Sequence, residues 1–231
     1  MILRVLFDQT LSSSSKLQLI IPQIIAVIII LFVILPLHEL AHGWVAYKFG
    51  DDTAKRAGRL TFNPLASIDI WGALMILLIG FGWAKPVPVN PSRMKHPRIG
   101  MAVTSAAGPF SNFLAALLGA LLYVGLLVGL GVGILDNFGI ELLSTFITIN
   151  VSLAVFNLLP IPPLDGSKIL AACLPQRAAQ TFYRYQGAFM MLLYALMFAG
   201  VLSGPLSTAQ TACTKGILWL AQLPFSLAGL L

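Results

Sequence analysis

The chain has 231 residues, of which 58% are apolar and only 10% are charged. A soluble domain carries about a quarter charged residues, so this composition excludes a soluble globular protein and indicates an integral membrane protein. The formal net charge is +6. Basic residues in membrane proteins mostly set topology, and we therefore expect no nucleic-acid partner.

Six apolar runs are candidates for membrane segments, because roughly 20 apolar residues span a bilayer. In chain order they cover 17–47, 65–84, 99–135, 140–159, 188–202 and 217–231. The last run is interrupted by Pro224 and small residues, so it either spans the membrane or lies in the interface. The sequence predicts an α-helical polytopic membrane protein with five or six membrane segments and no soluble region longer than a loop.

The basic residues predict the topology. Eleven of the fourteen lysines and arginines lie in three stretches, at 48–64, at 85–98 and after Pro160. The positive-inside tendency places all three stretches on the cytoplasmic side. Two of them flank the run 65–84, which therefore should not cross the membrane, and we predict a re-entrant or interfacial element over about 55–92. A plain spanning helix is the alternative for this run.

The flanks of this run predict a small membrane-associated β element. They read "GRLTFNPL" at 58–65 and "GWAKPVPVNP" at 82–91. The second stretch contains three prolines, which exclude a helix and favour an extended backbone.

The first run ends in "HELAH", at 38–42. His38 and His42 are four residues apart, so on a helix their side chains share one face and can bind one metal ion, as zinc sites require. Glu39 projects beside such an ion, where a general base can take a proton from water. An unpaired glutamate at membrane depth would be a pure cost in free energy.

Catalytic zinc usually has three protein ligands and an open fourth position. Most carboxylates of the chain lie in loops or at segment ends, where a solvated charge is the simpler interpretation. Asp165 differs, because three prolines precede it in "FNLLPIPPLDGSKIL" and Gly166 permits a sharp turn. If the run 65–84 does not span the membrane, Asp165 lies at the same side of the membrane as His38. An ordinary proline-rich loop is the alternative.

Three motifs together resemble the site-2 proteases, polytopic zinc metalloproteases that cut substrates within the membrane. They are HELAH, "GPFSN" at 108–112 and "NLLPIPPLDG" at 157–166, and the resemblance covers about 30–174. It implies transmembrane protein substrates in the lipid bilayer of the cell membrane. The topology predicted from the basic stretches places the active site nearer the cytoplasmic side. No segment is long enough for the PDZ or CBS domains of larger members, so a compact bacterial or archaeal-type member is expected.

The resemblance also implies roles for single residues. His38, His42 and Asp165 would bind one zinc ion, and Glu39 would be the catalytic base. The residues implied to hold the substrate are Asn157, Asn112, Val87, Pro88, Val89 and Asn90.

We expect one membrane-embedded metalloprotease domain over 1–231, with its core at about 17–174 and C-terminal helices at about 186–231. One alternative function is a membrane metal transporter or sensor without peptidase activity. A transporter needs further polar residues along a path, whereas apolar and small residues dominate 119–135 and 188–202. Another alternative is an inactive relative that binds membrane partners, which the intact HELAH and LDG motifs argue against.

Overall fold

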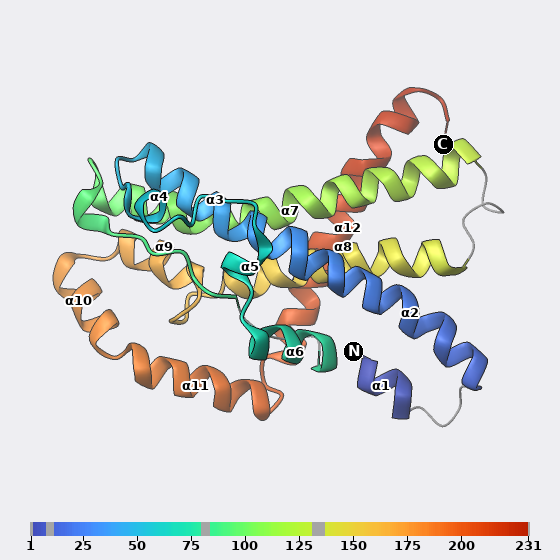
Figure 1. Cartoon of the computed structure of the whole chain (residues 1–231), viewed down its shortest axis with the longest axis horizontal. Coiled ribbons are helices and arrows are strands. Elements are labelled where there is room, and N and C mark those ends of the chain that lie inside the picture. Colours follow the sequence, from blue (N-terminus) through green and yellow to red (C-terminus); the bar gives the residue numbers. More distant parts are fainter. Residues whose placement is uncertain (1, 8–11, 80–83, 131–136, 231) are drawn as a thin grey trace.

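The computed structural model describes residues 2–7, 12–79, 84–130 and 137–230, and this part of the chain is mostly helical (Figure 1). The elements are α1 (Ile2–Phe7), α2 (Ser13–Ile29), η1 (Ile30–Ile34), α3 (Leu35–Lys48), α4 (Thr53–Arg56), α5 (Pro64–Ser67), α6 (Ile70–Ile79), η2 (Pro91–Arg93), α7 (Pro97–Leu130), α8 (Asn137–Asn157), α9 (Asp165–Cys173), α10 (Gln176–Arg184), α11 (Gln186–Phe198) and α12 (Ser203–Leu227).

The first long helix is a continuous rod made of α2, η1 and α3. Its candidate membrane span is Lys16–Lys48, 33 residues, which corresponds to about 50 Å at 1.5 Å per residue. Pro36 lacks an N–H and cannot close an ordinary helical hydrogen bond, and one π-helical turn at η1 precedes it without ending the helix. Because a bilayer's hydrocarbon core is about 30 Å thick, the rod is long enough to carry its histidines beyond the membrane centre.

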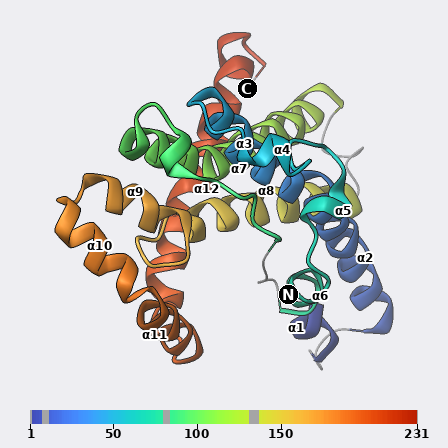
Figure 2. The ribbon, with the colours of Figure 1, turned by 60° about the vertical axis from the view of Figure 1, so that its left-hand side comes forward.

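The core between α7, α8 and α12 is built from small and β-branched residues. Ala116, Ala120, Val151 and Ala221 are fully buried there. Small side chains let membrane helices approach closely. Helix α12 crosses α7 and α8, while α9, α10 and α11 lie to one side of these long helices (Figure 1, Figure 2).

The structure confirms a helical polytopic protein but not the predicted number of five or six membrane segments. Three helices are long and apolar enough to cross a membrane, at Lys16–Lys48, Pro97–Gly129 and Asn137–Asn157. Helices α11 and α12 add a fourth if this pair, bent by 85°, counts as one span. Helix α12 begins well before the predicted start at residue 217, because small and polar residues at 203–216 mask its beginning in the apolar pattern.

The run 65–84 forms no spanning helix in the described residues. Helix α6 has ten residues, about 15 Å, which is half the thickness of the hydrocarbon core. Ile68 and Ala84 form an isolated antiparallel bridge. The two ends of the run therefore lie side by side, as a re-entrant element requires. Residues 80–83, which include Trp83 of the predicted second strand, lie outside the described residues.

The predicted small β element is not confirmed, since the described residues contain this one bridge and no strand. The prolines of the segment 84–95 have no N–H to donate to a neighbouring strand. Two other N–H groups of the segment donate hydrogen bonds to carboxylates instead. The N–H of Val87 donates to Glu39 (2.8 Å). The N–H of Asn90 donates to Asp51 (2.6 Å). The segment is therefore held by Glu39 of α3 and by Asp51 in the turn that follows this helix.

Asp51 is the central anchor of this arrangement and has no exposed surface. Its carboxylate accepts from the N–H of Asn90 and from the N–H and Oγ1 of Thr53. Asp51→Ala leaves these partly buried donors without their carboxylate partner, so we expect a loss of roughly 1–3 kcal/mol in the free energy of unfolding. A lower thermal unfolding temperature of the purified protein in detergent would record it.

The neighbouring Asp52 provides the matched control. It pairs at the surface with Arg56 and Arg93, and such exposed pairs contribute little. Asp52→Ala should therefore unfold close to the wild-type temperature. Equal unfolding temperatures for the two variants would contradict the anchoring role of Asp51.

Candidate metal centre

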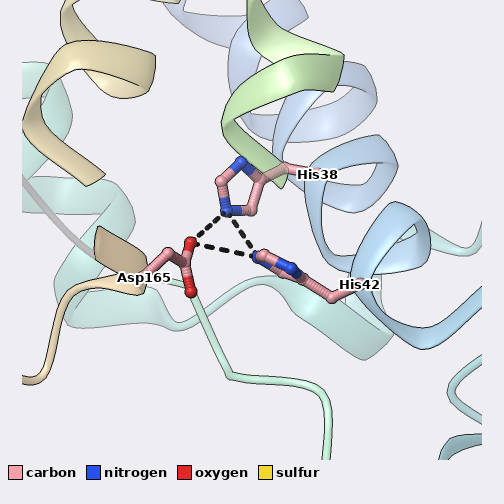
Figure 3. A group of neighbouring side chains, drawn as sticks. All are labelled: His38, His42 and Asp165. Atoms are coloured by element: carbon pink, nitrogen blue, oxygen red, sulfur yellow. Dashed lines mark hydrogen bonds and ion pairs between the residues drawn. The ribbon is translucent and has the colours of Figure 1, made fainter. Parts of the chain in front are cut away.

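Three side chains from two distant parts of the chain converge on one point (Figure 3). His38 and His42 lie on α3, and Asp165 is the first residue of α9. The Nε2 atoms of the two histidines are 3.0 Å apart. Oδ2 of Asp165 lies 3.4 Å from Nε2 of His38 and 3.1 Å from Nε2 of His42. All three residues are buried, as predicted for a shared metal site.

Gly108 allows α7 to pass against the two imidazoles. A Cβ atom at this position would lie 2.6 Å from Cε1 of His38 and closer still to the ring of His42. Real Cβ atoms do not make contacts this short, so any other residue would displace the rings. The glycine of the GPFSN motif is therefore explained by packing against the histidines.

Asp165 reaches the site because the chain cannot continue α8 as a helix. The helix ends at Asn157, and the prolines that follow exclude another helical turn. Gly166 then packs against the backbone at Leu158 and Leu159, where a Cβ atom would collide with the carbonyl oxygens of both residues. Helix α9 starts at Asp165, and the positive end of a helix favours a carboxylate in its first turn.

The outer nitrogens of the two imidazoles are held by α7. Nδ1 of His42 lies 2.6 Å from the carbonyl oxygen of Thr104. Nδ1 of His38 lies 3.0 Å from Oδ1 of Asn112. Both oxygens can only accept, so each Nδ1 carries the hydrogen and donates it. In the neutral rings each Nε2 then presents a lone pair to the shared point.

The carboxylate has an outer partner too. Nζ of Lys168 donates to Oδ1 of Asp165 (3.1 Å), which leaves Oδ2 facing the imidazoles. Burial opposes ionisation of Asp165, but hydrogen bonds from the imidazoles, when these carry a proton on Nε2, and the charge of Lys168 stabilise the carboxylate and hold its pKa below the usual range.

The geometry of the three facing atoms fits a zinc ion. Lone pairs at 3.0–3.4 Å repel one another unless positive charge lies between them. Tetrahedral zinc with ligand distances of about 2.0–2.1 Å places its ligand atoms about 3.3 Å apart. Two imidazoles and one carboxylate form a typical catalytic zinc donor set, and they leave the fourth position for water or substrate.

Glu39 lies beside this group in a cavity of about 830 Å³. Its carboxylate is not one of the three converging groups, and its Oε2 accepts the N–H of Val87. The cavity is bounded by α3, α7, α8, α9, the segment that carries Val87, α11 and α12. A carboxylate next to a metal-binding group inside a cavity of this size can exchange a proton with water.

The six residues predicted to hold substrate are placed differently from one another. Val87, Val89 and Asn157 line the cavity. Pro88 is not among its lining residues. Asn90 caps η2 by accepting the N–H of Ser92.

Asn112 has no exposed surface and lies against His38.

Sequence reasoning missed several residues of the site. Thr104 contributes a backbone carbonyl, which leaves no trace in the side-chain pattern. Lys168 lies in the basic stretch after Pro160, which predicts only topology, although its i,i+3 spacing from Asp165 indicates the ion pair. Tyr194 and Met197 of α11 line the cavity, but apolar residues in such a run look the same whether they face lipid or a site.

Taken together, the helical membrane fold, the histidine pair with its adjacent glutamate and the distant aspartate define a metallopeptidase of the membrane-protein class. The chain belongs to peptidase family M50, the site-2 protease family, whose family model matches residues 26–200. No solved structure matches the chain.

Three similar proteins are named as zinc metalloproteases, YwhC and Rip2 with the word "putative" in their names. YwhC of Bacillus subtilis is 45% identical over 171 residues, covering 72% of this chain and 78% of the relative. MJ0392 of Methanocaldococcus jannaschii is 30% identical over 149 residues, covering 64% of this chain and 34% of the relative. Rip2 of Mycolicibacterium smegmatis is 32% identical over 142 residues, covering 56% of this chain and 50% of the relative. The chain thus spans only a third to a half of the last two proteins.

The packing of Gly108 gives a direct test of the site. Gly108→Ala should weaken zinc binding by about tenfold or more, the cost typical of disturbing residues that orient metal ligands, because the added methyl group displaces both rings. Competition with a chromophoric chelator measures this affinity. Gly129→Ala, in the same helix but with open space around the new methyl group, is the control and should bind zinc normally. Equal affinities for the two variants would refute the packing argument.

Proposed function

We propose that this protein is an intramembrane zinc endopeptidase of the site-2 protease type, which hydrolyses peptide bonds within or near transmembrane helices of membrane protein substrates. One observation carries the proposal. Glu39 shares a cavity with the converging group of His38, His42 and Asp165. The family of the chain, peptidase family M50, supports the same conclusion.

His38, His42 and Asp165 are the residues that would hold the zinc ion. When bound, zinc supplies Lewis-acid chemistry, making water a better nucleophile and polarising a substrate carbonyl. The outer hydrogen bonds of the imidazoles keep their Nε2 atoms oriented for this purpose.

Glu39 moves the proton. Its carboxylate accepts a proton from the attacking water and later gives it to the leaving amine. The hydrogen bond from Val87 to Oε2 fixes the orientation of the carboxylate, so that Oε1 is available to the water. This contact also ties the base to the segment proposed to receive the substrate.

Asn157 is proposed to stabilise the negative charge that develops on the substrate carbonyl oxygen. It stands at the end of α8 and lines the cavity. Its Nδ2 donates to the carbonyl of Leu153 (3.0 Å), and a substrate oxygen must therefore compete with this intrahelical bond.

Substrate binding is proposed along Val87, Pro88, Val89 and Asn90. A helical substrate hides its peptide groups in its own hydrogen bonds, so it must unwind before cleavage. Pairing with the edge of an extended segment stabilises an unwound strand. Val87 and Val89 line the cavity, which supports placing the strand next to Glu39.

The protein is proposed to act as one membrane-embedded domain whose centre lies nearer the cytoplasmic side. The basic stretches at 48–64 and 85–98 adjoin the metal-centre end of α3 and support this orientation. The segment at about 55–92 is proposed as a re-entrant element, and 186–231 as C-terminal membrane helices. The family favours a peptidase over the alternative of a metal transporter or sensor.

Glu39→Gln separates peptidase chemistry from metal binding. Loss of the base should reduce cleavage of a model transmembrane substrate by about 10²–10⁴-fold. Zinc content should stay the same, because Glu39 does not belong to the converging group. Mass-spectrometric detection of cleavage products and metal analysis of the same preparation check both statements. Undiminished cleavage would remove Glu39 as the base, and a zinc-loaded wild type without any cleavage would favour the transporter or sensor.

A further inference from the structure

Asn112 lies behind the metal centre rather than in the cavity. It has no exposed surface, and it is not among the residues that line the cavity. Its Oδ1 contacts Nδ1 of His38, the ring nitrogen that points away from Asp165. Its Nδ2 is buried and has no hydrogen-bond partner among the described residues. A substrate in the cavity therefore cannot reach this amide.

The contact with Asn112 selects one tautomer of His38. With Oδ1 as acceptor, the hydrogen of the neutral ring sits on Nδ1, and Nε2 is free to bind a metal. The other tautomer would place a hydrogen on Nε2, only 3.0 Å from Nε2 of His42. That hydrogen would occupy the space in which the two rings and Asp165 converge.

The spacing of residues on α7 supports this role independently. Thr104, Gly108 and Asn112 are four residues apart, so they lie along one face of the helix. The first holds His42 through its carbonyl, the second makes room for the rings, and the third holds His38. The histidines have the same four-residue spacing on α3, so the two helices match in register.

We infer that Asn112 is a positioning residue of the metal centre, which accepts the Nδ1 hydrogen of His38 and thereby sets the affinity for zinc. This inference rests on the proposed function only in taking zinc as the metal. It gives the GPFSN motif a role in orienting a ligand rather than in holding substrate. Helix α7 holds Nδ1 of His38 through the side chain of Asn112, whereas it holds Nδ1 of His42 through a main-chain carbonyl. A substitution can therefore remove the first contact but not the second.

Two substitutions at Asn112 test the direction of the hydrogen bond. Asn112→Leu has a similar size but no acceptor, and it should weaken zinc binding about 10–100-fold. Asn112→Asp can only accept, so it should retain zinc affinity close to that of the wild type. Chelator competition measures both affinities. The absorption spectrum of the cobalt-substituted protein should change for the leucine variant and remain close to that of the wild type for the aspartate variant.

Asn150→Leu is the matched control. Asn150 is also fully buried, and its Nδ2 donates to the carbonyl of Phe146 in the same helix. Its Oδ1 has no hydrogen-bond partner among the described residues. This variant measures the general cost of deleting a buried amide. Its unfolding temperature should fall, whereas its zinc affinity and cobalt spectrum should match the wild type.

Three outcomes would overturn the inference. Unchanged zinc affinity in Asn112→Leu would show that Asn112 does not set the affinity for zinc. Loss of zinc in Asn112→Asp equal to that in Asn112→Leu would make Asn112 a donor. Equal zinc loss in Asn150→Leu would reduce the effect to general destabilisation. If Asn112→Leu does not fold, Asn112→Asp against the wild type decides alone. These readouts do not depend on cleavage, so they stand apart from a failure of the peptidase proposal.

Discussion

Positive charge at one buried point is the requirement on which the site depends. Two imidazole nitrogens and a carboxylate oxygen face one another at 3.0–3.4 Å, and buried groups of this kind are stable together only when a cation or protons lie between them. Residues at separate places in the chain allow the two histidines and Asp165 to come this close together. Gly108 gives space for the rings, and Gly166 lets α9 approach the end of α8.

A second set of contacts connects the centre to the segment at 84–95. Glu39 and Asp51 accept N–H groups of this segment, and Lys95 donates its N–H to the carbonyl of Phe49. The proposed base is thus hydrogen-bonded to the segment that is proposed to bind substrate. Any movement of the segment changes the surroundings of the base, so substrate binding and proton transfer are physically coupled in this proposal.

The sequence predicts the inner part of the site better than its surroundings. His38, His42 and Asp165 could be predicted because ionisable groups in an apolar chain require an explanation, and because their spacing and the proline-rich break restrict the possibilities. The direction in which Asn112 acts could not be predicted, since an amide can face either a substrate or a ligand. The predicted β element is not confirmed in the described residues, because extended, proline-rich residues need not pair, and here carboxylates accept two of their N–H groups.

The central claim is that one zinc ion joins α3 to the first turn of α9. Anomalous X-ray diffraction from crystals of the purified protein, recorded on both sides of the zinc absorption edge, tests it most directly. The account predicts a single strong difference peak within about 2.0–2.2 Å of Nε2 of His38, Nε2 of His42 and a carboxylate oxygen of Asp165. A zinc peak at another position, with Asp165 turned away from both imidazoles in the same crystal, would contradict it.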